Sequence, residues 1–334
     1  MRFQDHNRTW ACKIIAPMFV RILLYCACLL ICGGSVLAQR AANANQVRVK
    51  PEGSSPIHVD SDLVQIPVTV FDRDEQSVVG LEKEHFKLFE NRVEQVITHF
   101  AIEDAPISIG FVFDASASMS NKLPQSREAV ARVLNAANPG DEFFLVQFND
   151  QVELTADVTT STAEIQRQLM FIRPTGRTAL LDAVQFSVRR MRKANNARRA
   201  LIIISDGGDN CSRYTVSDLK TLVREEDVQI YALGIFDSSE GRQQALEELA
   251  GPALLRAVAK QSGGHLFEIE NINQLPDVAA KIGEALRTQY VLGYAPKATP
   301  RDGKYHSVEV KLAPPRSARK LQASWRRGYY APVE

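Results

Sequence analysis

Cysteine is scarce in most of this chain. Of its five cysteines, only Cys211 lies beyond residue 32. If the first 38 residues are removed, one cysteine remains and no internal disulfide can form. No pair among the six histidines has the spacing of zinc ligands, and the sequence contains neither a G-x-S-x-G nor an H-E-x-x-H motif. The sequence therefore lacks the signatures of a zinc site and of two common hydrolase classes.

Net charge and long apolar segments are also lacking. The 40 basic residues (Lys and Arg) and 39 acidic residues leave a formal net charge of +1, so no strong overall field attracts nucleic acid or an anionic membrane. The basic cluster at residues 189–199 has no aromatic residues for stacking on bases. The apolar run at residues 22–31 is shorter than the roughly 20 residues that a membrane-spanning helix needs. We therefore expect no nucleic-acid partner and no membrane span in the mature chain.

Residues 1–38 have the features of an export signal. Four basic residues precede the apolar run, and Val36 and Ala38 suit cleavage after a small residue. We predict that residues 1–38 are a signal peptide, that residues 39–61 are a flexible leader, and that the mature protein is periplasmic or extracellular. A retained N-terminal membrane anchor is the alternative.

Short apolar runs alternate with helical patterns in the middle of the chain. Four runs are typical of parallel strands buried on both faces, at residues 107–113, 143–148, 201–204 and 229–233. Between them, apolar residues recur with the spacing of amphipathic helices, and Ser161 to Glu164 has the pattern of a capping box. We predict a doubly wound, mostly parallel α/β domain over residues 106–290. Gly251-Pro252 interrupts one helical pattern, which predicts two helices, the second beginning near Pro252.

Strand patterns also flank this domain on both sides. Candidate strands precede it at residues 64–70, 86–89 and 93–100, and follow it at residues 308–312 and 321–325. Neither set has enough strands to be stable alone. We predict that residues 62–105 and 291–334 pair with each other into one β-sandwich-like module.

Three polar segments of the α/β domain carry candidate binding residues. Asp114-Ala-Ser-Ala-Ser118 follows a buried strand, Ser205-Asp-Gly-Gly-Asp209 ends another, and Thr175-Gly-Arg-Thr178 precedes a helix. Ligands of doubly wound sheets bind where the carboxyl ends of the strands converge. Hard cations such as Mg²⁺ prefer oxygen ligands, and these segments offer carboxylates and hydroxyls.

Taken together, these segments resemble the metal-ion-dependent adhesion site of von Willebrand factor type A domains. The mature chain is also similar to the exported "VWFA-related" proteins of bacteria, from about residue 62 to about residue 331. In that group a β segment like residues 86–100 is coupled to the A domain, and the chain ends with segments like residues 290–294 and 327–330. The resemblance implies that a Mg²⁺ or Mn²⁺ ion is held by five residues, with Asp206 acting through water: Asp114, Ser116, Ser118, Thr178 and Asp206.

The resemblance further implies an exported, non-enzymatic module that binds a protein partner. Hydroxyl and water ligands leave the cation under-neutralised, so an Asp or Glu of the partner can complete its shell. Asp182 and Asp209 are candidates to support the ligands from behind, although Asp182 also suits the N-terminus of its helix and Asp209 a surface turn. Arg177 either attracts an anionic ligand or is a solvated surface arginine.

Other interpretations of the same residues remain open. Ser, Asp and Thr also cap helices, so residues 114–118 could be a capping loop, although capping explains only one of the three segments. A metal-dependent hydrolase needs a general base beside the metal, for which Asp206 and Asp209 are the available carboxylates. A structural envelope protein with a vestigial site is the third possibility.

Overall fold

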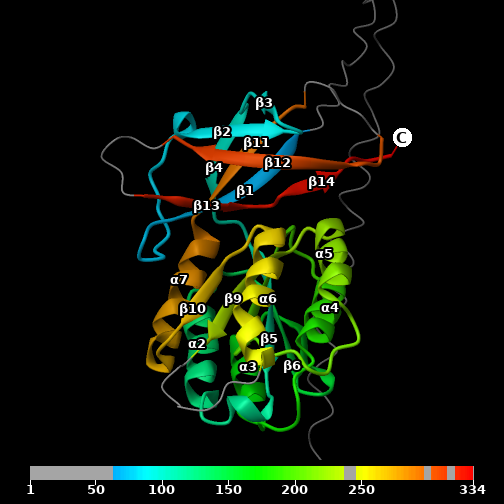
Figure 1. Cartoon of the computed structure of the whole chain (residues 1–334). Coiled ribbons are helices and arrows are strands. Elements are labelled where there is room, and N and C mark those ends of the chain that lie inside the picture. The colour runs from blue at the N-terminus through cyan, green and yellow to red at the C-terminus, as the bar shows by residue number, and fades with distance from the viewer. Residues whose placement is uncertain (1–62, 237–245, 297–301, 314–319, 334) are drawn as a thin grey trace, which may run out of the picture. The chain divides into compact units, whose positions relative to one another are not determined.

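The computed structural model describes residues 63–236, 246–296, 302–313 and 320–333, and the predicted signal peptide and leader lie outside them. Its central sheet has six strands in the order β10-β9-β8-β5-β6-β7 (Figure 1). Every neighbouring pair is parallel except β6 and β7. The strands are β5 (Ile107–Asp114), β6 (Glu142–Phe148), β7 (Val152–Thr159), β8 (Arg198–Ser205), β9 (Gln229–Ile235) and β10 (Leu266–Ile269). The mostly parallel α/β sheet predicted from the sequence is confirmed.

Helices cover both faces of this sheet, because successive residues of a strand point to opposite faces. On β5, Phe111 and Phe113 belong to a hydrophobic cluster with α2, α3 and α7, whereas Val112 belongs to a second cluster with α4, α5 and α6. The helices are α2 (Leu123–Asn135), α3 (Thr162–Leu169), α4 (Leu180–Met191), α5 (Val216–Glu225), α6 (Leu246–Ser262) and α7 (Leu275–Arg287), with 3₁₀ helices η1 (Lys83–His85), η2 (Ala117–Met119) and η4 (Ile272–Gln274). None of the helices in the described ranges is long and apolar enough to cross a membrane.

The remaining strands form two antiparallel sheets, ordered β13-β1-β11-β4 and β14-β12-β2-β3. They are β1 (Val64–Phe71), β2 (Phe86–Glu90), β3 (Val93–Gln95), β4 (His99–Glu103), β11 (Gln289–Tyr294), β12 (Tyr305–Leu312), β13 (Gln322–Trp325) and β14 (Gly328–Tyr330). β1 pairs with β11 and β13, and β2 pairs with β12, so each sheet joins strands from both ends of the chain. Val68, Leu88 and Tyr290 lie fully buried in a shared third cluster. The predicted pairing of the two flanking segments is confirmed, and we call this part the β module.

Several local predictions were wrong. Residues 93–100 form two strands because β3 pairs with β2 in one sheet and β4 pairs with β11 in the other, so the chain must cross between sheets. Two strands were not predicted from the sequence: β7, an edge strand with few buried residues, and β10, which has only four residues. The helix α6 runs unbroken through Gly251 and Pro252.

The predicted capping box at the start of α3 forms only in part. Ser161 Oγ accepts a hydrogen bond from the backbone N of Glu164 at 3.2 Å, as expected of a capping serine. The Glu164 carboxylate instead accepts from Thr159 Oγ1 at 3.0 Å, and the Ser161 N–H donates to the same Thr159 oxygen. Thr159, at the end of β7, therefore takes the place of the reciprocal bond.

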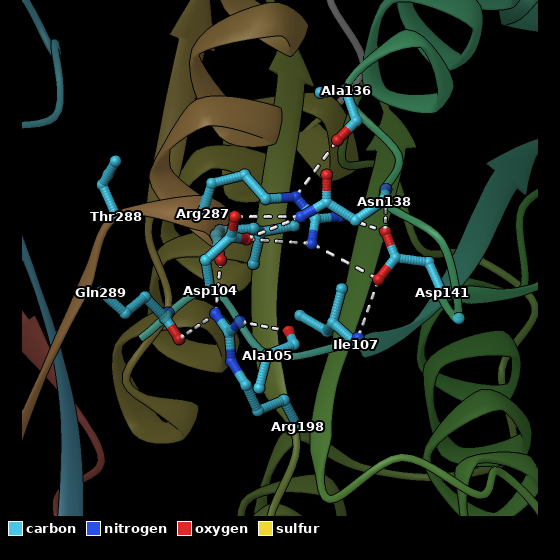
Figure 2. A network of polar contacts seen from close by, with 12 residues as sticks. Asp104, Ala105, Ile107, Ala136, Asn138, Asp141, Arg198, Arg287, Thr288 and Gln289 are labelled. Atoms are coloured by element: carbon cyan, nitrogen blue, oxygen red, sulfur yellow. Dashed lines mark hydrogen bonds and ion pairs between the residues drawn. The ribbon is translucent and has the colours of Figure 1, made fainter. Parts of the chain in front are cut away.

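The chain passes between the β module and the α/β domain at two segments, which two arginines hold together (Figure 2). Arg198 of β8 donates to the carbonyl of Ala105, just before β5, at 2.7 Å, and to Oε1 of Gln289 in β11 at 3.0 Å. Arg287, the last residue of α7, forms an ion pair with the fully buried side chain of Asp141. Because a buried charge must be paired, these contacts fix where β5 begins and where α7 ends.

Candidate functional site

The first predicted segment, Asp114 to Ser118, begins at the last residue of β5 and continues into η2. Asp114 is fully buried, and its carboxylate accepts two hydrogen bonds, at Oδ1 from the backbone N of Ser116 (2.9 Å) and at Oδ2 from Ser205 Oγ (2.5 Å). The Oγ atoms of Ser116 and Ser118 lie 3.1 Å apart. One carboxylate and two hydroxyls are thus gathered within five residues.

Core contacts hold this segment on both sides of its serines. Ala115 and Met119 are buried in the cluster that β5 shares with α2, α3 and α7. The backbone N of Ala115 also donates to the carbonyl of Phe148, at the end of β6, at 2.7 Å. The serine positions are therefore set by the packing of the sheet rather than by the loop alone.

Asp206 follows β8, the parallel neighbour of β5, so the two carboxylates lie at the same edge of the sheet. Its side chain is 7% exposed, and Oδ2 lies 3.2 Å from Nζ of Lys122, which is also largely buried. Ser205 connects the two loops, because its hydroxyl donates to Asp114 and accepts from the backbone N of Gly207 at 3.0 Å.

A contact between two glycines brings the Asp206 loop against α6. A Cβ atom built on Gly207 would lie 2.8 Å from Cα of Gly251, and Gly207 has a φ of +83°. Any side chain at either position would push the helix and the loop apart. Gly251, which suggested a helix break in the sequence, therefore permits the close approach of α6 to the site.

The third segment, residues 175–178, is hydrogen-bonded to the first segment and to Asn210, the residue that follows the second segment. The backbone N of Thr175 donates to the carbonyl of Ala115 at 2.8 Å, and the N of Ala117 donates to the carbonyl of Gly176 at 3.1 Å. Thr178 is 5% exposed and its backbone N donates to Oδ1 of Asn210 at 3.0 Å. The fold therefore brings together the three segments that carry the five predicted ligands.

Electrostatics at this sheet edge favour an added cation. Burial and, to a lesser extent, the negative charge of Asp206 together raise the pKa of Asp114 to about 7, although hydrogen bonds from Ser116 and Ser205 act in the opposite direction. Two buried carboxylates close together are costly to ionise unless positive charge is nearby. Lys122 supplies one such charge beside Asp206.

The donor set fits a hard divalent cation. All five predicted side chains offer oxygen, the ligand type that Mg²⁺ prefers, and two are carboxylates. Within the described ranges, no group of three or more His, Cys, Asp or Glu could hold a metal ion. A cation at this site would also need hydroxyl oxygens or water as ligands.

The carboxylates of Asp182 and Asp209 accept hydrogen bonds from backbone N–H groups close to the third segment. Asp182 Oδ1 accepts from the backbone N of Arg213 (2.9 Å) and of Tyr214 (3.1 Å). Asp209 Oδ1 accepts from the backbone N of Leu180 at 3.0 Å, at the start of α4. Burial raises the pKa of Asp209. Both carboxylates thus fasten residues 209–214 to the first turn of α4, directly after Thr178.

Two residues of the site were not given a role from the sequence. Ser205 hydrogen-bonds Asp114 across 91 positions, and Lys122 pairs with Asp206 across 84 positions. A serine before Asp206 and a lysine after the Asp114–Ser118 segment are visible in the sequence, but no local pattern says that they meet carboxylates.

Other features singled out in the sequence are engaged elsewhere. In the basic cluster, Arg190 pairs with Asp157 and Arg192 with Glu226.

A cleft of about 700 Å³ lies between the turn after β1 and the start of β10, where Arg256 pairs with Glu268. It is at the amino end of β10, away from the strand ends where the three segments meet.

Comparison with known proteins places the α/β domain in a family. The sequence matches the family model described as von Willebrand factor type A domain over residues 108–281, just over half of the chain. The inter-alpha-trypsin inhibitor heavy chain H2 of Sus scrofa is 25% identical over 193 residues, which cover 53% of this chain and 20% of that protein. Heavy chain H4 of Bos taurus is 24% identical over 219 residues, 59% of this chain and 23% of that protein. The chain spans about a fifth of the length of these curated relatives.

Solved structures are similar over part of the chain. The von Willebrand factor type A protein from Catenulispora acidiphila is 14% identical, covers 82% of this chain and 64% of its own, and has a TM-score of 0.48. BatB from Bacteroides thetaiotaomicron is 17% identical, covers 55% of this chain and 100% of its own, and has a TM-score of 0.44.

Proposed function

The chain belongs to the von Willebrand factor type A domain family, and we propose that it binds an acidic side chain of a protein partner through a divalent cation. The observation that carries the proposal is the convergence of Asp114, Ser116, Ser118, Thr178 and Asp206 through hydrogen bonds between their three segments. Mg²⁺ or Mn²⁺ is the cation that this donor set suits. When bound, it would supply a positive centre that attracts a carboxylate of the partner.

The charges of the site favour an acidic ligand over a neutral one. Asp114 and Asp206 are the only carboxylates among the five ligands, and Lys122 already balances Asp206. A divalent ion therefore keeps net positive charge, and a partner carboxylate gains more from it than an amide does. Ca²⁺ suits the site less well because its bonds are longer and it takes more ligands.

The positions of the nearby carboxylates support binding rather than catalysis. A hydrolase would need a free general base beside the cation. Asp206 is paired with Lys122, and Asp209 accepts hydrogen bonds from Leu180 and Ser212. Both candidate bases are therefore already held by other groups.

The remaining parts of the proposal come from the sequence. Residues 1–38 act as an export signal, or as a retained anchor, and residues 39–61 as a leader, which places the protein in the periplasm or outside the cell. The β module orients the α/β domain toward its partner.

Calorimetric titration of Mn²⁺ into wild type and variants tests the cation site. Asp114→Asn should abolish measurable binding, and Ser118→Ala should weaken it roughly tenfold, since one removes the buried charge and the other a neutral ligand. Ser120→Ala is the matched control, because this serine lies two residues after Ser118 but its Oγ donates to the carbonyl of Ala117. Wild-type affinity in both Asp114→Asn and Ser118→Ala would show that the cation does not bind here.

A further inference from the structure

A short turn after α3 presents two large apolar side chains to solvent. Met170 and Phe171 are 61% and 71% exposed, and Phe171 is the most exposed aromatic residue in the described part of the chain. Covering apolar side chains this exposed with a partner removes their surface from water, which favours binding. Because they are adjacent, their side chains together form a small exposed apolar surface, which isolated exposed residues do not.

The core holds this turn in place from both sides. Leu169 and Ile172, which flank the pair, are each 2% exposed. Arg127 of α2 donates from Nε to the carbonyl of Leu169 at 3.0 Å and from Nη2 to the carbonyl of Ile172 at 2.9 Å. Met170 and Phe171 therefore cannot turn inward without breaking these anchors.

The same turn leads directly to the proposed cation site. Residues 172–177 connect the turn to Thr178. The hydrogen bond from Thr175 N to the carbonyl of Ala115 holds this connection against the Asp114–Ser118 segment. Arg173 and Arg177 within it are exposed, and neither has an ion-pair partner among the residues that the structure describes. Along the chain, two arginines without such partners thus lie between the apolar pair and Thr178 of the proposed cation site.

We propose that Met170, Phe171, Arg173 and Arg177, here called the apolar–basic surface, bind a partner segment in which apolar residues adjoin an acidic one. The inference rests on the proposed function, because the acidic residue would complete the cation's shell while its neighbours contact this surface. Charge complementarity selects the occupant. The chain's own residues 39–61 carry three basic and two acidic residues, so the two arginines do not favour them.

A phage-displayed library of random dodecapeptides provides the test. Selection on wild type in Mn²⁺ should enrich peptides with Asp or Glu within a few positions of Leu, Phe or Met. The double variant Met170→Ser/Phe171→Ser should enrich acidic peptides without the apolar preference. A synthetic copy of the most enriched wild-type peptide should bind this variant at least tenfold more weakly by fluorescence anisotropy. Val96→Ser, which changes a 69% exposed valine in the β module, is the control and should bind as wild type does.

The arginines and the cation are tested separately with the same peptide. Arg173→Ser/Arg177→Ser should weaken binding several-fold and reduce its dependence on salt. Equal peptide pools from wild type and from the Met170→Ser/Phe171→Ser variant, or no enrichment at all, would overturn the inference. Enrichment that survives EDTA but still depends on Phe171 would uphold the surface and contradict the cation-dependent function. A shift from dimer to monomer in the Met170→Ser/Phe171→Ser variant by sedimentation velocity would identify a second copy as the occupant and overturn the inference.

Discussion

Lys122 places an ammonium group against one of the two carboxylates at the sheet edge. Its Nζ lies 3.2 Å from Asp206 Oδ2, and the two side chains are 13% and 7% exposed. An ion pair this buried is costly to break from one side, because the remaining charge is left without a partner. The lysine therefore balances the site in the absence of a divalent ion and repels such an ion when it arrives.

We expect Lys122→Gln to raise the affinity for Mn²⁺ roughly tenfold, since it removes a positive charge close to the incoming cation. The same change should lower the unfolding free energy of the cation-free protein by about 1–3 kcal/mol, because Asp206 loses its partner. Calorimetry with Mn²⁺ and urea unfolding in EDTA measure the two effects. Lys193→Gln, an exposed lysine after α4, should change neither. Unchanged Mn²⁺ affinity in Lys122→Gln would contradict this account.

At the scale of elements, the C-terminal end of α7 and the beginning of β5 depend on one buried carboxylate, that of Asp141. Asp141 accepts from the backbone N of Ile107 at 2.9 Å and of Asn138 at 2.7 Å, and it forms the ion pair with Arg287 (Figure 2). Arg287 also donates to the carbonyl of Ala136, after α2, at 3.1 Å. One arginine thus links the loop after α2, the start of β5 and the end of α7.

Arg287→Ala should destabilise the protein by about 3 kcal/mol, because it leaves the Asp141 charge buried and unpaired. Arg132→Ala breaks an exposed pair with Glu128 within α2 and should cost less than about 0.5 kcal/mol. Urea unfolding followed by circular dichroism compares the two variants. Equal costs for both would show that the network of Arg287 is not a structural link.

For the whole molecule, the fold should not depend on the cation. Two hydrophobic clusters cover the two faces of the central sheet, and a third fills the β module. With a Kd on the order of 0.1 mM and about 1 mM Mg²⁺, binding adds roughly 1.4 kcal/mol, a small part of the stability of such a domain.

Thermal unfolding with 1 mM Mg²⁺ and with EDTA measures this contribution. We expect a folded protein in both, with a Tm a few degrees higher in Mg²⁺. Asp114→Asn should show no difference between the two conditions. Unfolding of the wild type by EDTA alone would point to a cation that the fold requires.

Sequence periodicity was enough to predict the elements that carry the site. The fully buried strand β5 and the amphipathic helices predicted a parallel sheet covered on both faces. Polar residues at two strand ends and before one helix marked the three segments. The pairing of the two chain ends also followed, because each set of strands was too small alone.

Contacts between distant residues were decided only by the tertiary structure. The order of β5 and β8 in the sheet brings Ser205 to Asp114, and the start of α2 brings Lys122 to Asp206. From the sequence, Gly251 was predicted to break a helix, whereas in the structure it lies within α6 and contacts Gly207. Local patterns record which face of an element is buried, whereas these contacts depend on which elements become neighbours, and that is set by the packing of the whole chain.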